Sequence, residues 1–521
     1  MKNKKYTLTA VAGSFLIGGL ILAGCASPET ATEVSPVVTT EVTTTPVDVT
    51  ESIGAVAAEV LAANANTTTV NSDEWSMDGA VSIALDGTTA SADGEGVTVA
   101  DSTVTISAAG TYVLSGQFDG QVVVDTEDED VVALVLDGVE ISNSTSAAIN
   151  VVNAEDVVVS LSGTNVLTST GDDEEANATL FSDADLTITG DGSLTVSSVN
   201  DGITSHDDLV VLSGTIDVTA GDDGLRGKDS LVVEGGTITV DAAGDALKSD
   251  QEEDDTRGFI HIAGGTLDLA AGDDGLQAQT DLVITGGEMT VDAEDDGLKS
   301  EVYIVVSGGD TSVVNSYEGV ESYYITIEGG ALAVLATDDG INATSGTSTT
   351  TDIGGVVEDD DGAMLTVTGG ETIVSAEGDG VDTNGSALIT GGTLTVFGSS
   401  SDREGALDAN GSIVVDGGTV LAVGTTGMAV SPDASSVQGW FSASLDQSFG
   451  AGETVQVLDD SGELIVEFTS VKTFQSVVLS DAALEEGATY SITVGGQSAG
   501  TAVEGVEAAS TTGGGGAPGR P

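Results

Sequence analysis

A repeat of about 22 residues constrains the fold of this chain more than any other feature. An acidic position is followed by a small residue at Gly202, Gly224, Ala246, Gly275, Gly297, Gly319, Gly340, Gly380 and Gly405, with spacings of 22, 22, 29, 22, 22, 21, 40 and 25 residues. A period with occasional insertions is typical of a solenoid, in which each repeat packs against its neighbours. The two long insertions, 250–258 and 344–361, are expected to be loops that leave one coil without breaking the stack.

Within each repeat, short β-forming runs such as 231–233 and 237–240 alternate with Gly-Gly and Asp-Gly turns. No proline interrupts the chain between Pro46 and Pro432, as continuous hydrogen-bond ladders require. We therefore predict an all-β fold, a right-handed parallel β-helix with about 22 residues per coil, the hand following from the preference of parallel crossovers. One inward stack of leucine side chains is predicted, formed by Leu225, Leu247, Leu276 and Leu298. Each of these side chains contributes roughly 1.5–3 kcal/mol to stability when it is fully buried.

The two ends of the chain differ from the repeats. Three lysines precede an apolar run at 8–22 that ends in Leu-Ala-Gly-Cys, which is typical of a secretory signal with a lipoprotein cleavage site. Beyond Pro432 the period is lost, and alternation predicts a small antiparallel β domain. The predicted parts are a signal peptide (1–24), a lipidated Cys25 with a Thr- and Pro-rich tether (25–74), the β-helix (75–430), the small β domain or cap (431–505) and a Gly- and Pro-containing tail (506–521).

These features predict a protein on the extracellular face of the cell envelope, anchored to a membrane by the lipid on Cys25. The chain has 86 acidic and 11 basic residues and a formal net charge of −75. This balance excludes nucleic acid as a partner, because phosphate binding needs clustered Lys and Arg. We expect a monomer.

Acidic residues recur at the coil spacing. Because neighbouring coils lie ~4.7–4.9 Å apart, they form a line of like charges that a calcium ion, with its six to eight oxygen ligands, would neutralise. Turn chemistry at Asp-Gly together with an acidic surface is the alternative explanation. The predicted calcium ligands are Asp201, Asp222, Asp223, Asp245, Asp273, Asp274, Asp295 and Asp296.

Basic and aromatic residues of the repeats are the candidates for glycan binding. Those that directly follow the stacked leucines should line one outer face, with Gln277 between Lys248 and Lys299, and salt bridges to the acids are the alternative role. A lysine near calcium also fits a polyuronate lyase, with Lys248 or Lys299 as the base. His206 has no paired nucleophile and is expected to be an ordinary surface residue. The glycan-binding candidates are Arg226, Lys228, Lys248, Lys299, Tyr317 and Tyr323.

Several segments resemble the bacterial carbohydrate-binding-domain lipoproteins, which have a calcium-binding, pectate-lyase-like parallel β-helix. They are AGTYVLSGQFDGQVVVD (109–125), VVALVLDGVEI (131–141), ANATLFSDADLTITGDGSLTV (176–196), NDGITSHDDLVVLSGTIDV (200–218), DDGLRGKDSLVVEGG (222–236), DALKSDQEEDD (245–255) and DDGLQAQTDLVITGG (273–287). The resemblance implies cell-surface display and binding to cellulose-like and acidic plant polysaccharides. It implies calcium ligation by Asp222, Asp223, Asp245, Asp273 and Asp274. This chain departs from the family at Ala246, where glycine is usual, and at His206, where relatives often carry lysine.

The sequence therefore predicts a cell-surface lipoprotein that binds cellulose-like or acidic, pectic polysaccharide through a calcium-containing β-helix. A calcium-dependent pectate-type lyase is the enzymatic alternative, although no catalytic constellation is evident. A structural surface spacer or adhesin is the third possibility.

Overall fold

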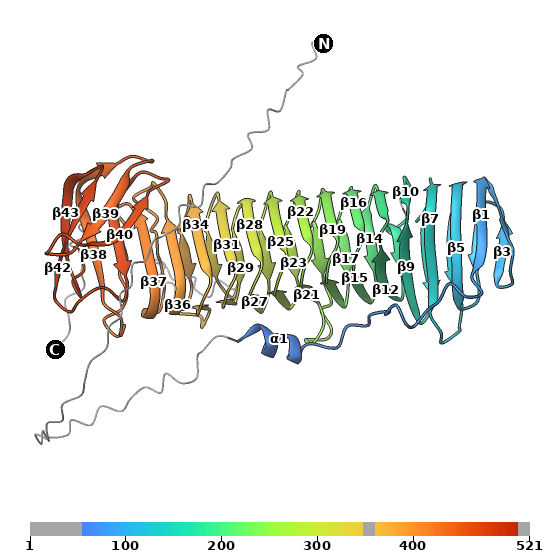
Figure 1. The fold of residues 1–521 in the computed structure, drawn as a ribbon, viewed down its shortest axis with the longest axis horizontal. Helices are drawn as coiled ribbons and strands as arrows, with labels where there is room; N and C mark the ends of the chain where they lie inside the picture. The colour runs from blue at the N-terminus through green and yellow to red at the C-terminus, as the bar shows by residue number, and fades with distance from the viewer. Residues whose placement is uncertain (1–54, 172, 347–359, 509–521) are drawn as a thin grey trace, which may run out of the picture.

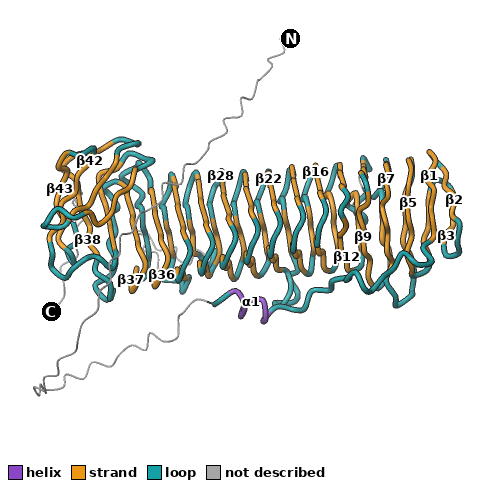
Figure 2. Tube along the Cα trace, viewed as in Figure 1, coloured by secondary structure: helices purple, strands orange, loops and turns teal. Residues whose placement is uncertain are grey.

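The structure, a computed structural model, describes residues 55–171, 173–346 and 360–508 (Figure 1). The predicted signal peptide, Cys25, most of the tether, most of the 344–361 loop and the end of the tail lie outside the described residues. Among the described residues, no helix has the length and apolar character needed to cross a membrane. The one described helix, α1 (Ala57–Ala63), lies in an Ala-rich segment of the chain, and all other described elements are strands (Figure 2).

Three β faces form each coil of the helix. The first face is a parallel stack of β9 (Asp156–Ser162), β12 (Asp185–Gly190), β15 (Asp208–Val211), β18 (Ser230–Val233), β21 (Phe259–Ile262), β24 (Asp281–Ile284), β27 (Tyr303–Val306), β30 (Tyr324–Ile327) and β33 (Met364–Val367). The second face stacks β10 (Thr164–Ser169), β13 (Ser193–Ser197), β16 (Thr215–Ala220), β19 (Thr237–Ala242), β22 (Thr266–Ala271), β25 (Glu288–Ala293), β28 (Asp310–Asn315), β31 (Ala331–Ala336) and β34 (Glu371–Ala376). Long strands that pair with both stacks, β7 (Val132–Asn143) and β36 (Ser386–Phe397), join them into one sheet.

The third face is a separate sheet of 13 strands, several of them only three residues long. It comprises β3 (Val97–Ala100), β4 (Thr103–Ile106), β6 (Gln121–Asp125), β8 (Ile149–Asn153), β11 (Ala178–Ser182), β14 (Asp201–Ser205), β17 (Leu225–Gly227), β20 (Leu247–Ser249), β23 (Leu276–Ala278), β26 (Leu298–Ser300), β29 (Val320–Ser322), β32 (Ile341–Ala343) and β35 (Val381–Thr383). The first coils are completed by β1 (Val81–Gly87), β2 (Thr89–Ala92) and β5 (Gly110–Asp119). The predicted all-β parallel β-helix is confirmed.

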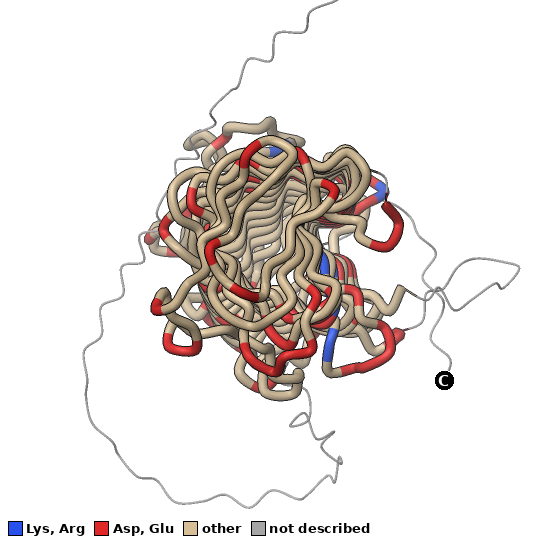
Figure 3. The backbone as a smooth tube through the Cα atoms, turned by 90° about the vertical axis from the view of Figure 1, so that its right-hand side faces the viewer, with Lys and Arg blue, Asp and Glu red and all other residues tan. Residues whose placement is uncertain are grey.

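The interior of the helix is a continuous column of aliphatic side chains. Leu225, Leu247, Leu276 and Leu298 are fully buried and pair in register from coil to coil, so the predicted inward stack is confirmed. Viewed along the axis, the acidic residues gather at turns on the outside of this column (Figure 3).

A small antiparallel region follows the last coil. β37 (Ile413–Gly424) pairs with β41 (Phe474–Ser480), and β41 pairs with β38 (Trp440–Phe449). A four-stranded sheet of β39 (Thr454–Leu458), β40 (Leu464–Thr469), β42 (Thr489–Val494) and β43 (Gln497–Val503) packs with them around a core of its own. This region covers the apolar end of the column, which would otherwise face water.

Before the first coil, residues 55–75 form a strap that runs along the first face, from the middle of the β-helix toward its N-terminal end and thus opposite to the direction of the coils (Figure 1). Helix α1 packs Ala57 and Val60 on Val283 and Val305. Further on, backbone N–H groups of the strap donate to side chains of the face, from Thr68 to Asp208 at 2.7 Å and from Val70 to Thr187 at 3.0 Å. The strap thus covers the first face and leaves the third face open.

The alanine at position 246 is explained by a second difference in the same coil. In the coils with glycine, an added Cβ would overlap a valine side chain of the same coil and a carbonyl oxygen of the next, as at Gly275 with Val291 and Gly297. In the coil of Ala246, Leu269 occupies the position that is valine in its neighbours, and leucine is not branched at Cβ. The two exceptions therefore compensate each other.

This pairing predicts that Gly275→Ala is destabilising and that Val291→Leu partly restores stability. Overpacking of this kind costs about 1–3 kcal/mol, and the carbonyl contact remains in the double variant. The control is Ala246→Gly, which removes one buried methyl group but introduces no overlap and should lower the midpoint less. Thermal and urea unfolding midpoints of the four proteins measure this, and equal midpoints for Gly275→Ala and the parent would refute it.

Candidate functional site

A line of buried and half-buried acids runs along the corner between the second and third faces. We call it the acid ladder: Asp201, Asp223, Asp245, Asp274, Asp296, Glu318, Asp339 and Asp379. The first five are at most 6% exposed. One oxygen of most ladder acids accepts the backbone N–H of its counterpart in the next coil, as from Asp245 to Asp223 Oδ1 at 3.0 Å and from Asp274 to Asp245 Oδ1 at 2.9 Å. This leaves the second carboxylate oxygen of each acid to meet a cation or another donor.

The residue three positions after each ladder acid decides what that second oxygen meets. This side chain reaches from the third face toward its own ladder acid and the acid of the preceding coil. Lys248 Nζ lies 2.6 Å from Asp245 Oδ2 and 3.1 Å from Asp223 Oδ2. Lys299 Nζ lies 2.6 Å from Asp296 Oδ2 and 3.8 Å from Asp274 Oδ2. Each lysine therefore fills the gap between two ladder acids.

Arg226 occupies the same position but is directed elsewhere. Its guanidinium donates to Asp250 at 2.7 Å and lies 3.9 Å from Asp201. Asp201 Oδ2 instead accepts from Asn177 at 2.8 Å and from Thr204 at 3.1 Å. The group formed by Asp201, Asp222 and Asp223 thus has only part of the positive charge that the two lysine gaps have.

Two of the gaps that have no basic residue at the third position lie on either side of the Lys299 gap. Gln277 stands between Asp245 and Asp274, where Asp273 adds a third carboxylate. Its Oε1 atom is buried and has no hydrogen-bond partner in the described part of the chain. Glu321 stands between Asp296 and Glu318, so that three acids meet there as well. Next to them Asn342, 9% exposed, donates to Glu318 at 2.7 Å while its Oδ1 has no partner among the described residues.

Burial sets the protonation of the acid ladder. Desolvation raises the pKa of Asp274 to about 7, against the opposing pull of Lys299, and that of Asp201 to about 6, with the charge of Asp223 adding to it. Desolvation also raises the pKa of Glu318, which is further raised by its hydrogen bond to Glu321. The two lysines behave differently: burial alone would lower the pKa of Lys248 and Lys299, but the facing carboxylates outweigh it and hold both pKa values above the ordinary range.

The structure brings all eight predicted calcium ligands together along this corner. Asp222, Asp273 and Asp295 stand one residue before a ladder acid and group with acids of adjacent coils: Asp222 with Asp201 and Asp223, Asp273 with Asp245 and Asp274, and Asp295 with Asp274 and Asp296. The sequence reasoning did not identify Glu321, Asn342, Asp382 and Asp408, the last two of which group with Asp379. Glu321, Asn342 and Asp382 each follow a ladder acid by three residues, and this spacing is the signal that could have identified them. Asp408 does not have this spacing.

The predicted glycan-binding residues are not brought together. Arg226, Lys248 and Lys299 lie in register on one outer face, but Lys248 and Lys299 pair with acids of the ladder and Arg226 pairs with Asp250. Lys228 is half-buried in the turn after β17. The ring of Tyr323 packs on Tyr324 and its hydroxyl donates to the carbonyl of Asp361. Tyr317 is exposed, and a hydrogen bond to Asp338 raises its pKa to about 12.

His206 lies on the surface in contact with an acid. Its Nδ1 is 2.7 Å from Asp183, and its ring packs edge-on against Phe181. No nucleophile faces it among the described residues. This arrangement fits the expectation that His206 is an ordinary surface residue.

Comparisons with known proteins place these residues in a wider group. The sequence model of a family described as carbohydrate-binding domain-containing protein matches residues 100–351. A protein of the same description from Acetivibrio thermocellus is 44% identical over 195 residues, which cover 35% of this chain and 68% of that protein. The gadolinium derivative of a polysaccharide lyase-like protein from C. thermocellum matches with 34% identity and a TM-score of 0.42, over 43% of this chain and 96% of the other. The family match includes the acid ladder from Asp201 to Asp339.

The raised pKa values predict that the protein without divalent cations is more stable at pH 5 than at pH 8. Folded Asp274 and Asp201 keep their protons to about pH 7 and 6, whereas unfolded aspartate, with a pKa near 3.8, releases them earlier. Their contribution to stability is therefore complete below about pH 4 and lost as the pH rises to about 7. Thermal unfolding in a chelator measures this.

Two variants in one coil test whether this pH dependence of stability comes from the acid ladder or from the general acidity of the chain. Asp274→Asn should reduce the loss of stability between pH 5 and pH 8, because the amide does not titrate. Asp268→Asn, which changes an exposed acid of the same coil, should leave it unchanged. A midpoint that is the same at both pH values, or an equal effect of both variants, would contradict the assignment.

Proposed function

The chain belongs to the family of carbohydrate-binding domain-containing proteins, and from that premise we propose that it is a lipid-anchored protein of the cell surface that binds polysaccharide through its β-helix. The proposed polymers are cellulose-like glycans and acidic, pectic glycans. Calcium is the proposed ion of the acid ladder. The observation that carries this proposal is the pair of gaps in which acids face a neutral or acidic residue where a lysine stands in other coils.

The donor atoms of these gaps suit calcium. Calcium prefers carboxylate and amide oxygens and takes six to eight of them. The first gap offers Asp245, Asp273 and Asp274 together with the unpartnered Oε1 of Gln277. The second offers Asp296, Glu318 and Glu321, with the unpartnered Oδ1 of Asn342 beside them. A calcium ion held by three carboxylates would offset most of their negative charge and leave ligand positions that a uronate carboxylate fills.

The gaps with lysine have a different role in this proposal. Lys248 and Lys299 neutralise the carboxylates on both sides, so an ion placed there would be repelled. Calcium therefore alternates with lysine along the acid ladder. This also explains why so acidic a chain places its few basic residues within the coils rather than on an open binding surface.

The lyase alternative has less support from these contacts. A general base must lose its proton near the working pH, and enzymes lower the pKa of lysine for this purpose. Lys248 and Lys299 have raised pKa values because carboxylates hold the charged form. The spacer or adhesin alternative requires a protein partner and no glycan retention, and the binding experiment below distinguishes it.

Calcium titration of the chelator-treated protein should release or absorb heat at the two gaps. Asp273→Asn removes one carboxylate from the first gap and should weaken the uptake of calcium there at least several-fold. Asp268→Asn, an exposed acid of the same coil, should titrate like the parent. Lys248→Gln, which replaces a cation by an amide, should create a further calcium-binding gap between Asp223 and Asp245. If the parent takes up no calcium, the proposal is wrong and the acids of the ladder serve only to form the Asp-Gly turns.

Retention on immobilised polygalacturonate should require calcium, and should fall in Asp273→Asn but not in Asp268→Asn. The ultraviolet absorbance of the same mixtures reports turnover, because a lyase leaves an unsaturated product. We expect retention without a rise in absorbance. A rise that is abolished in Lys299→Gln would establish the lyase alternative, and no retention on either polygalacturonate or cellulose would favour the spacer or adhesin.

A further inference from the structure

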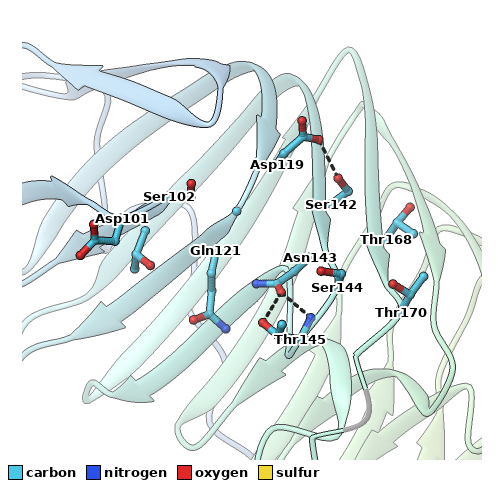
Figure 4. Close-up of a pocket in the computed structure, with 12 residues that line it drawn as sticks. Asp101, Ser102, Asp119, Gln121, Ser142, Asn143, Ser144, Thr145, Thr168 and Thr170 are labelled. Atoms are coloured by element: carbon cyan, nitrogen blue, oxygen red, sulfur yellow. Dashed lines mark hydrogen bonds between the residues drawn. The ribbon is translucent and has the colours of Figure 1, made fainter.

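A polar hollow of about 470 Å³ lies at the N-terminal end of the β-helix, outside the acid ladder (Figure 4). Its volume falls within the range of about 300–1,000 Å³ that is usual for sites of small ligands. The twelve residues that line it carry no aromatic ring and no positive charge, and most bear a hydroxyl or amide group. Such a wall matches a ligand that is rich in hydroxyl groups and uncharged.

The hollow lies at the corner that continues into the acid ladder. Its walls come from Asp119–Gln121 where β5 passes into β6, from 142–145 at and after the end of β7, and from Thr168 in β10 and Thr170 directly after it. Pairing of β8, β11 and β14 places Ala147 and Ala178 in register with Asp201. The ladder position is thus alanine in these coils, and it becomes acidic from Asp201 onward along the axis.

The rim of the hollow is held in an uncommon backbone conformation. Asp101 and Ser102, with φ of 50° and 61°, are the non-glycine residues with positive φ in the described chain. They form the two-residue turn between the antiparallel strands β3 and β4, for which Asn-Gly or Gly-Gly is the favoured sequence. Strain of this kind is concentrated at ligand sites, because glycine would relieve it but would remove the side chains.

Several polar groups face the hollow from different coils. Asn143 Oδ1 accepts from the N–H and the hydroxyl of Thr145 at 2.9 Å, which leaves the amide NH₂ of Asn143 turned toward Gln121 (Figure 4). The hydroxyls of Thr168 and Thr170 make no hydrogen bond to another residue in the described part of the chain. Asp101 and Asp119 add carboxylates, which accept strongly from sugar hydroxyls and repel a uronate.

We propose that this hollow is a subsite for a neutral polysaccharide chain, separate from the calcium-dependent binding of acidic sugars at the acid ladder. The proposal rests on the proposed function and assigns its two polymer classes to two parts of one corner. Binding at the hollow needs no calcium. A soluble β-1,4-linked gluco-oligosaccharide of six units is the probe, with an oligogalacturonate of the same length as the competitor.

The full chain should bind the gluco-oligosaccharide equally in calcium and in chelator, and the oligogalacturonate should not compete. Thr168→Val with Thr170→Val keeps the shape of the wall and removes two hydroxyls, so binding should weaken roughly 5- to 100-fold. Thr164→Val, an exposed threonine of the same strand outside the hollow, is the matched control and should bind like the parent. Retention of the double variant on polygalacturonate with calcium shows that it is folded.

The outcomes separate this proposal from the proposed function. Retention on polygalacturonate without binding of the gluco-oligosaccharide, or equal binding by parent and double variant, overturns the hollow alone. Binding that disappears in chelator or in Asp273→Asn moves the neutral sugar to the acid ladder and also overturns it. Failure of the parent to bind either glycan overturns both proposals.

Discussion

The hydrogen bond from a backbone N–H to the ladder carboxylate of the preceding coil is the interaction on which the rest of this structure depends. It uses one oxygen of each acid to hold successive coils in register, as between Asp223, Asp245 and Asp274. It also fixes the acids one coil apart in a buried corner, where their mutual repulsion is screened poorly. A fold that is stacked in this way must neutralise the second oxygens, and the residue three positions later is the means that the chain uses.

That position explains the unusual distribution of charge. With 11 basic residues against 86 acids, the chain has too few cations to pair every acid on its surface. It places Lys248 and Lys299 between buried acids, and there each lysine meets two carboxylates. An ion pair of this kind fixes the register of adjacent coils more than it adds to the free energy of unfolding, because the desolvation of the charges offsets much of their attraction. The cost of that choice is that the same lysines are not available to grip an acidic sugar.

The sequence predicts the coil and its core because both depend on local pattern. The 22-residue period, the glycines and the leucine stack all follow from spacing alone. Even the alanine at 246 is explained when Leu269 is compared with the valines at the same position of other coils. The gaps could not be derived in the same way, since the partner of Lys248 depends on the parallel register of β17 and β20 and on the direction of a long side chain. The strap and the hollow depend on contacts between residues far apart in the chain, such as Thr68 with Asp208, for which no period exists.

One corner of the helix therefore presents two different sets of side chains along the same backbone conformation. Where the ladder position is alanine, at 147 and 178, the corner is lined mostly by hydroxyls and amides with two carboxylates, and from Asp201 onward it is lined by the acid ladder. Parallel stacking at ~4.7–4.9 Å per coil makes this corner a straight track. The strap leaves this corner open because the strap covers the first face, and the corner lies between the second and third faces. A polymer is suited to such a track, since it can follow the axis over many coils, whereas a small ligand would meet only one kind of wall.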